Sequence, residues 1–382
     1  MSEQTPHRRR PRYSGKYPRR FDQKYKELNG NPATLARVLA SGKTPAGSHV
    51  PIMVRETIEV LNPQPGEIAV DCTLGYGGHT RCLLQSVAPD GHVLGLDADP
   101  LELPKTVDAL RREGFGLEIF TARKSNFAGL HAALTATGFS GADVILADLG
   151  VSSMQLDNPA RGFTWKAPGP LDMRMNPSRG ISAAQWLLKT TPAALEAALI
   201  ENADEPDAAT LAYALAGKPL ETTTELADAI RLALPNRAAD LVDKAIRRCF
   251  QAVRIAVNEE FNALDALLRV LPTCLRPGGR VAILTFHSGE DRRVKKAFQA
   301  GLQDGTFDSI SRDIIRASHF ECRANPRASS AKLRWARRAE AAPPGGEAFE
   351  NSSSPSDIHP SVSSAIAAQF DRAKVIRHPV KP

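Results

Sequence analysis

The chain has 382 residues, of which 42% are hydrophobic and 24% charged, a composition that excludes wholesale disorder. Its length is enough for about two domains with a substantial buried core. The formal net charge is +7, yet residues 1–26 carry nine Lys and Arg against two acids, so the rest of the chain sums to neutral. Attraction for polyanions is therefore concentrated in the N-terminal arm.

The cysteines and the hydropathy of the chain restrict its expected cellular location and its expected bound groups. The five cysteines are an odd number without a C-x-x-C pair, which argues against a disulfide framework or a zinc site. We therefore expect no bound metal and a reducing, cytoplasmic location. No apolar run approaches ~18 residues, so no membrane span is expected.

The basic arm covers residues 1–45. It is rich in Arg and Pro, and no apolar region follows its arginines, so it is not a secretory signal. An organelle transit peptide is one alternative. The prolines and the missing amphipathic period favour the other, a disordered arm that touches RNA.

Ordered structure is expected to begin near His49, with a short helix ending at Leu61. A stretch at residues 66–99 then reads as strand, glycine loop, helix, strand and acid. Its elements are an apolar run Ile68–Val70 ending in Asp71, glycines at 75, 77 and 78, a helix Thr80–Val87, and a second apolar run Val93–Leu96 ending in Asp97. This is the layout of a βαβ nucleotide site, in which the second acid bonds ribose hydroxyls.

The details of this stretch favour one class of ligand. The glycines do not fit G-x-G-x-x-G, and Asp71 stands at the entry to the loop. A dinucleotide pyrophosphate would be repelled by that carboxylate, which disfavours the alternative of an NAD(P) dehydrogenase. A cationic amino-acid head group would be attracted, and S-adenosylmethionine has one. The stretch therefore predicts a methyltransferase.

Alternation of strands and helices continues to residue 148. The expected elements are a helix Leu101–Arg112, a strand Leu117–Phe120, a helix Ala128–Thr137 and a buried strand Ala142–Ala147 followed by Asp148. This alternation predicts an α/β fold with a doubly wound parallel sheet.

The alternation then stops. Residues 150–180 are loop-like, and helical periodicity follows in Ala183–Lys189, Ala193–Ile200, Thr223–Leu234 and a long run from Ala238. After Pro277-Gly-Gly, a strand Arg280–Phe286 is expected, and Ser288-Gly-Glu-Asp is an N-cap signal for a helix through Phe298.

These patterns predict a helical domain inserted after the fourth strand. The expected boundaries are 46–159 and 246–339 for the two parts of the α/β domain, 160–245 for the insertion and 340–382 for a flexible tail. Because the fourth strand ends at the ligand-bearing edge of such a sheet, the insertion would lie over the substrate.

The acceptor chemistry can be narrowed from the same residues. No cysteine follows a proline, so methylation of a pyrimidine at C5 through a cysteine nucleophile is disfavoured. The segment from Asp148 to Gln155 supplies hydrogen-bond acceptors where amino-methyltransferases hold an exocyclic amine. Such an amine is a weak nucleophile, so catalysis would rest on positioning and on an acceptor that localises its lone pair.

Several motifs in one order carry a resemblance to a known family. They are Asp71-Cys-Thr-Leu-Gly-Tyr-Gly-Gly-His-Thr, Asp148-Leu-Gly-Val-Ser-Ser, Arg161-Gly-Phe-Thr, Gly169-Pro-Leu-Asp-Met-Arg-Met175, Phe250-Gln-Ala-Val-Arg-Ile255, Phe286-His-Ser and Asn325-Pro-Arg327. Over residues 48–338 the chain resembles the bacterial small-subunit ribosomal RNA methyltransferase H family, also called MraW. The resemblance implies a class I, Rossmann-like methyltransferase sheet with a helical insertion. It also implies S-adenosylmethionine as cofactor and N4-methylation of a cytidine in the decoding region of 16S rRNA, within the small ribosomal subunit.

The resemblance also assigns residues. Donor contacts would be Gly77, Gly78, His79, Asp97, Phe127, Asp148 and Gln155, with Asp148 also the catalytic candidate. Substrate-side candidates are Asp172, Arg174, Arg254 and His287. For Arg174 and Arg254 the alternative is an internal ion pair, and for His287 it is a structural histidine. The segment 202–215 lacks basic residues that the family carries there, which motivates an alternative: a non-catalytic RNA-binding ribosome-assembly factor that keeps the fold. Oligomeric state is left open.

Overall fold

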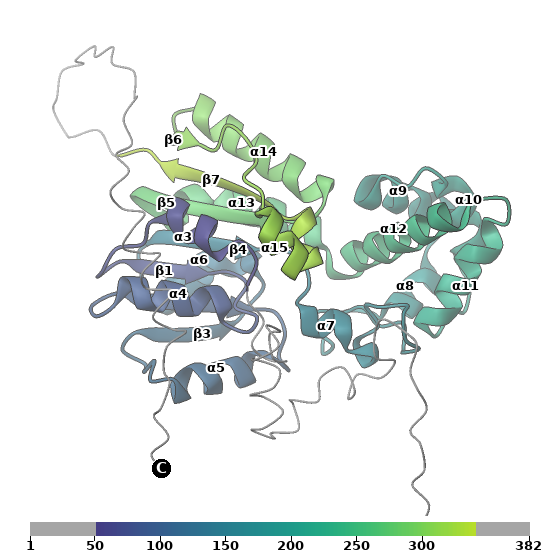
Figure 1. Ribbon diagram of the computed structural model, residues 1–382, viewed down its shortest axis with the longest axis horizontal. Helices are drawn as coiled ribbons and strands as arrows, with labels where there is room; N and C mark the ends of the chain where they lie inside the picture. The colour runs from purple at the N-terminus through teal and green to yellow at the C-terminus, as the bar shows by residue number, and fades with distance from the viewer. Residues whose placement is uncertain (1–50, 341–382) are drawn as a thin grey trace, which may run out of the picture. The chain divides into compact units, whose positions relative to one another are not determined.

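The computed structural model describes residues 51–340, so the basic arm at 1–45 and residues 341–382 of the tail lie outside the described residues. The described residues comprise a sheet flanked by helices and a separate group of helices, drawn in teal in Figure 1. Among residues 51–340, no helix combines the length and the apolar content that a membrane crossing requires.

The sheet confirms the predicted fold class. Its strands are β1 (Ile68–Asp71), β2 (His92–Asp97), β3 (Phe120–Lys124), β4 (Ala142–Asp148), β5 (Leu275–Thr285), β6 (Phe307–Ile310) and β7 (Lys332–Arg338). They lie in the order β3-β2-β1-β4-β5-β7-β6. Strands β1 to β5 pair in parallel, and β7 runs antiparallel to both β5 and β6. This is the α/β arrangement of a class I methyltransferase.

Helices cover both faces of the sheet. They are α3 (Val54–Leu61), α4 (Gly78–Val87) and α5 (Leu103–Arg112) on one face, and α6 (Leu130–Ala136), α13 (Glu260–Cys274) and α14 (Ser288–Gln303) on the other. The central strand β4 shows why its sequence is apolar throughout. Val144 and Leu146 pack with the first set of helices, whereas Ile145 and Ala147 pack with the second. A parallel strand buried on both faces has no polar side.

The inserted helices have a hydrophobic core of their own. They are α8 (Ala183–Lys189), α9 (Pro192–Ala203), α10 (Ala208–Leu215), α11 (Thr223–Ala233) and α12 (Ala239–Asn258). Leu187, Leu195, Leu211 and Ile246 are among the fully buried side chains of this core. Capping boxes at Ser182 and Thr222 start α8 and α11, as their sequences favour.

The expected boundary at residue 245 falls inside α12. This helix is continuous to Asn258, and its residues as far as Val253 belong to the core of the inserted helices. Glu259 then adopts a left-handed conformation (φ 50°) and α13 begins at the next residue. The division of the chain into domains at 159/160 and 245/246 stays a prediction.

Some elements differ from the sequence prediction. Strand β3 is Phe120–Lys124, not Leu117–Phe120, because Leu117 belongs to a turn and its side chain is 72% exposed. As an edge strand, β3 tolerates polar residues, and these gave it no apolar run by which a strand could be predicted. Strand β5 begins at Leu275 and includes the Pro-Gly-Gly segment expected to precede it. Helix α10, strands β6 and β7, and the short helix α15 (His319–Ala324) were not predicted.

The N-cap expected at Ser288 is also wrong. Ser288 is the first residue of α14, the capping position is His287, and no side chain caps the helix. The Ser288 hydroxyl instead donates to Asp204 Oδ2 (2.9 Å), at the end of α9. The apparent signal therefore serves contact with the inserted helices.

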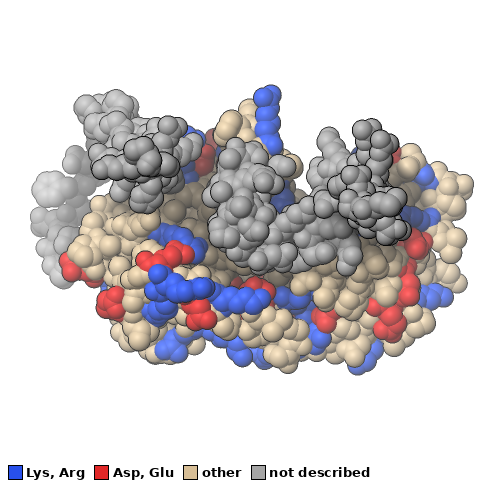
Figure 2. Space-filling view, turned by 60° about the horizontal axis from the view of Figure 1, so that its bottom comes forward, with Lys and Arg blue, Asp and Glu red and all other residues tan. Residues whose placement is uncertain are grey.

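The described part of the chain has no dominant charge. Figure 2 shows Lys and Arg interspersed with Asp and Glu over one face of the molecule. This mixture agrees with the neutral sum expected for the chain beyond its basic arm.

Arg280 joins α3 to the sheet and provides a test of the fold. Its guanidinium donates to Leu61 O (2.9 Å), Asn62 O (2.9 Å) and both carboxylate oxygens of Glu67 (2.7 and 2.8 Å). We predict that Arg280→Ala lowers the free energy of unfolding by about 3 kcal/mol, since it removes charged hydrogen bonds and leaves their acceptors unpaired.

Urea unfolding measures this loss. The matched control is Arg231→Ala, which breaks an ion pair whose side chains are 47% and 73% exposed and should cost about 0.5 kcal/mol or less. Equal losses in the two variants would contradict the role given to Arg280.

Candidate active site

Three aspartates end neighbouring parallel strands. Asp71 ends β1, Asp97 ends β2 and Asp148 ends β4. Since these strands are adjacent in the sheet, their carboxyl ends bring the three side chains to one edge. In open α/β sheets this edge is where ligands bind.

Asp71 holds the entry of the site together. Its carboxylate, in a residue only 1% exposed, accepts hydrogen bonds from Thr73 N (3.0 Å) and from the Thr80 hydroxyl in α4 (2.6 Å). The Thr73 hydroxyl in turn accepts from Asp148 N (2.7 Å). One buried acid thus orients the loop after β1, the first turn of α4 and the end of β4.

The glycine loop leaves the backbone accessible at Gly75. Both Gly75 (φ 48°) and Gly77 (φ 70°) have left-handed conformations, which glycine adopts at little cost. A side chain at Gly75 would meet one atom within 4 Å, Thr73 O at 3.8 Å, so the space beside it is open. Gly78 differs, because a Cβ there would lie 2.8 Å from Pro51 Cγ. Its smallness serves internal packing.

Asp97 closes the other side of this loop. Its Oδ2 accepts from Gly75 N (2.8 Å) and its Oδ1 accepts from Asp99 N (2.8 Å). Burial raises the pKa of Asp97 to about 6, although the two backbone N–H groups oppose that rise. A carboxylate has about four acceptor positions, so two remain for ligand hydroxyls.

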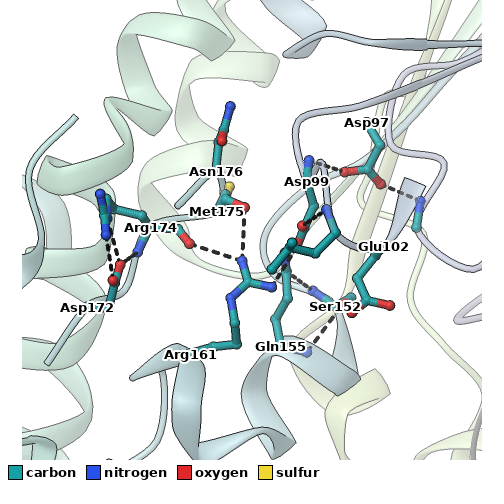
Figure 3. Close-up of polar contacts among 12 residues, drawn as sticks. Asp97, Asp99, Glu102, Ser152, Gln155, Arg161, Asp172, Arg174, Met175 and Asn176 are labelled. Carbon is teal, nitrogen blue, oxygen red and sulfur yellow. Dashed lines mark hydrogen bonds and ion pairs between the residues drawn. The ribbon is translucent and has the colours of Figure 1, made fainter. Parts of the chain in front are cut away.

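A second layer of side chains centres on Asp99 (Figure 3). Gln155 Nε2 and Arg161 Nη1 both donate to Asp99 Oδ2 at 2.7 Å. Arg161 also donates to the carbonyl oxygens of Arg174 (3.1 Å) and Met175 (2.9 Å). The expected donor residue Gln155 therefore uses its amide within the protein, where it fixes the short helix α7 (Ser153–Asp157) against the end of β2.

Sequence reasoning missed the roles of Asp99 and Arg161. The available signal was the repeat of acids in Asp97-Ala-Asp99 and the Arg161-Gly-Phe-Thr motif, but nothing in the sequence joins residues 62 positions apart. The expected donor residue Phe127 begins the short helix η2 (Phe127–Gly129). It packs against the core on the face of the sheet that α6, α13 and α14 cover.

Asp148 has an unsatisfied acceptor. Its Oδ1 is buried and has no hydrogen-bond partner among the described residues, while its Oδ2 lies 3.8 Å from His79 Nδ1. Burial, with the charges of Asp71 and Glu290, raises the pKa of Asp148 to about 8. The free protein therefore carries a largely protonated carboxyl at this point at neutral pH.

His79 is neutral beside it. The residue is 5% exposed, and burial lowers the pKa of His79 despite the nearby charge of Asp71. Its Nε2 lies 3.1 Å from Ile52 O, so that nitrogen carries the proton and donates. This tautomer presents an unprotonated Nδ1 to Asp148.

The predicted substrate residues separate into two kinds. Arg174 pairs with both oxygens of Asp172 (2.8 and 2.7 Å), and Arg254 pairs with both oxygens of Glu260 (2.7 and 2.9 Å). Burial would raise the pKa of Asp172, but hydrogen bonds from Arg174 lower it. Both guanidiniums are thus committed to internal ion pairs.

His287 is available for a ligand. It follows β5, and Leu149 N donates to Leu284 O (3.0 Å), so the segments after β4 and β5 run side by side. Its Nε2 lies 3.1 Å from Glu290 Oε1, whereas its Nδ1 is buried and has no hydrogen-bond partner among the described residues. Burial would raise the pKa of Glu290, but His287, Phe286 N and Arg254 together lower it.

The site fits a cationic donor that carries a ribose. The space beside the Gly75 backbone is open, acceptor positions remain on Asp97, and Asp148 keeps an unpaired oxygen. A pyrophosphate would face three carboxyl groups. Among residues 51–340, no group of three or more His, Cys, Asp or Glu is placed to hold a metal ion.

The sheet order and the acid-lined edge define a class I methyltransferase. Comparison with known proteins gives the family: the profile of the MraW methylase family matches residues 46–339, and the chain belongs to it. Ribosomal RNA small subunit methyltransferase H 1 of Agathobacter rectalis is 48% identical over 351 residues, covering 89% of this chain and 100% of that protein. Ribosomal RNA small subunit methyltransferase H 1 of Lachnoclostridium phytofermentans is 45% identical, covering 88% of this chain and 95% of that protein. The chain is a methyltransferase, and S-adenosylmethionine is the cofactor expected for it.

The raised pKa of Asp148 predicts a dependence of stability on pH. The folded protein holds this proton up to about pH 8, whereas the unfolded chain releases it near pH 3.9, so the group destabilises the fold increasingly as pH rises between these values. We predict that Asp148→Asn removes this loss. The melting temperature of the variant should exceed that of the wild type at pH 8, and the difference should shrink toward pH 4.

Scanning calorimetry across this pH range tests the prediction. The measurement at pH 4 is the internal control, because the side chain is uncharged in both folded proteins there. A difference in melting temperature that stays constant between pH 4 and pH 8 would show that Asp148 is not desolvated.

Proposed function

We propose that this protein transfers a methyl group from S-adenosylmethionine to N4 of a cytidine in the 16S rRNA of the small ribosomal subunit. The observation that carries the proposal is the buried, unpaired Oδ1 of Asp148 at the acid-lined edge of the sheet. An exocyclic amine has the N–H donors that this oxygen lacks. The names of the relatives point to small-subunit ribosomal RNA, and such an enzyme would work in the cytoplasm.

Donor binding would use Asp97 and the loop at Gly75, beside Asp148. Bound S-adenosylmethionine supplies an activated methyl group on a positively charged sulfur. Asp97 would accept from the ribose hydroxyls, and the open backbone at Gly75 would admit the methionine moiety. A cation near Asp148 favours its ionised form, so a bound donor would lower the pKa of Asp148 from its raised value. The carboxylate is then ready when the acceptor arrives.

The acceptor side would use Asp148 and His287. The amine nitrogen of cytosine is a weak nucleophile, and a hydrogen bond from its N–H to Asp148 Oδ1 localises the lone pair for attack. Methyl transfer releases one proton from that nitrogen, and the Asp148 carboxylate is placed to accept it. The Nδ1 of His287, which has no partner among the described residues, would bond the edge of the ring. Reaching this site requires that the base leave its stack.

Arg174 and Arg254 are proposed to act indirectly. Their ion pairs with Asp172 and Glu260 leave no free charge for phosphate, so these guanidiniums would shape the substrate side without contacting RNA. The alternative of a non-catalytic assembly factor gains no support from the site, which keeps its three aspartates in place.

Asp97 gives the first functional prediction. Asp97→Asn should weaken binding of S-adenosylmethionine by about 10- to 100-fold, because one acceptor for the ribose is lost and the new amide faces two backbone N–H groups. In the wild type the affinity should fall as pH drops through about 6, since protonation removes acceptor positions.

Titration calorimetry at pH 5.5, 6.5 and 7.5 measures both effects. Asp108→Asn is the matched control, because Asp108 is exposed on α5 and forms no ion pair with a described residue. Unchanged affinity in Asp97→Asn would contradict the ribose assignment.

Asp148 gives the second functional prediction. Asp148→Asn should lower kcat by about 10²- to 10⁴-fold, the usual contribution of a positioned proton acceptor, while the variant stays folded. Mass spectrometry of 16S rRNA from a deletion strain, complemented with wild type or variant, provides the cellular readout. N4-methylcytidine that persists in the deletion strain would refute the substrate assignment.

A further inference from the structure

Helix α15 carries an exposed aromatic ring close in sequence to basic side chains. Phe320 is 84% exposed, and Arg316, His319 and Arg323, all within four residues of it along the chain, are also exposed. None of these three basic residues forms an ion pair with any described residue. A single exposed apolar side chain is ordinary. A ring flanked by uncompensated positive groups is a combination that nucleic-acid-binding surfaces use.

Helix α15 is fixed at its start by two hydrogen bonds. The Ser318 hydroxyl caps it by accepting from Glu321 N (3.1 Å), and Glu321 Oε1 accepts from Met53 N (2.8 Å). The only acid within α15 is therefore turned inward to the backbone of the segment before α3. Its outer face keeps Phe320 and Arg323.

Two sets of contacts place α15 beside the active site. Ile52, the residue before Met53, provides the carbonyl that accepts from His79. The segment Ile52-Met53 therefore contacts both α15 and the active site. Arg327, just after α15, donates to Asp157 at the end of α7 (3.1 Å). Figure 1 shows α15 at the end of the sheet that faces α7 and the inserted helices.

We propose that α15 is an RNA-docking platform, on which Phe320 stacks an unpaired base near the target cytidine while Arg316 and Arg323 contact its phosphates. This inference rests on the proposed function. A target base drawn from its stack exposes its neighbours, and a base has a flat π-face that a rigid phenyl ring can cover. The positive charge around the ring complements phosphate. It is unlike the apolar surroundings that a protein contact would need at its centre.

Steady-state methylation of small ribosomal subunits tests the platform. Phe320→Ala should raise KM by about tenfold or more, the loss expected when one base no longer stacks on an aromatic ring. The value of kcat and the affinity for S-adenosylmethionine should be unchanged, and Phe320→Trp should keep the wild-type KM. Arg323→Ala should weaken binding and reduce the slope of log affinity against log salt by about one.

Leu117→Ala is the matched control. Leu117 is 72% exposed and precedes β3, at the edge of the sheet opposite the active site, so its loss should leave KM unchanged. A second measurement uses the unaltered protein: 16S rRNA labelled with 4-thiouridine should crosslink to the peptide that contains Phe320.

The outcomes separate this inference from the proposed function. If the wild type methylates rRNA and Phe320→Ala has the same KM, the platform is wrong and the enzyme assignment stands. If the wild type does not methylate rRNA, the proposed function is wrong, and the crosslink alone decides whether α15 binds RNA. A changed oligomeric state in Phe320→Ala without a changed KM would make Phe320 a contact between copies and overturn the inference.

Discussion

The active site depends on how Asp71 is buried. A carboxylate removed from water must be satisfied by hydrogen bonds, and Asp71 finds them in Thr73 N and the Thr80 hydroxyl. Those two partners set the path of the loop and the start of α4. Because Thr73 also holds Asp148 N, the demand of one buried charge fixes the relative positions of β1, α4 and β4.

The carboxyl groups at this edge of the sheet repel one another when they are charged. Burial raises the pKa of Asp148, and the charges of Asp71 and Glu290 add to this effect. The guanidinium of Arg161 pairs with Asp99. An arrangement that favours protonation in the free protein favours a cation when one binds. The destabilisation by Asp148 and its proposed function thus have one cause, as is common at catalytic sites.

Part of the fold and of the site can be predicted from the sequence. Buried parallel strands are apolar throughout, so β1, β2 and β4 and the acids that end them can be found from residue order alone. Edge strand β3 lacks that signature and was placed three residues early. The pairs Arg161–Asp99 and Arg254–Glu260 could not be inferred, because a charged residue gives no sign of whether its partner is solvent, RNA or another side chain. Arg174 and Arg254, the two arginine candidates for the substrate side, form internal ion pairs, an alternative that the sequence left open.

These ion pairs have a consequence for the acceptor side. Arg254 lies on α12, which begins among the inserted helices and ends against α13. Its charge lowers the pKa of Glu290, and Glu290 in turn contacts His287 and raises the pKa of Asp148. Since Coulomb interactions are stronger in a buried site than in water, the position of α12 affects the two groups proposed to meet the cytosine. The inserted helices are therefore coupled to the chemistry by charge as well as by shape, through a residue that need not touch RNA.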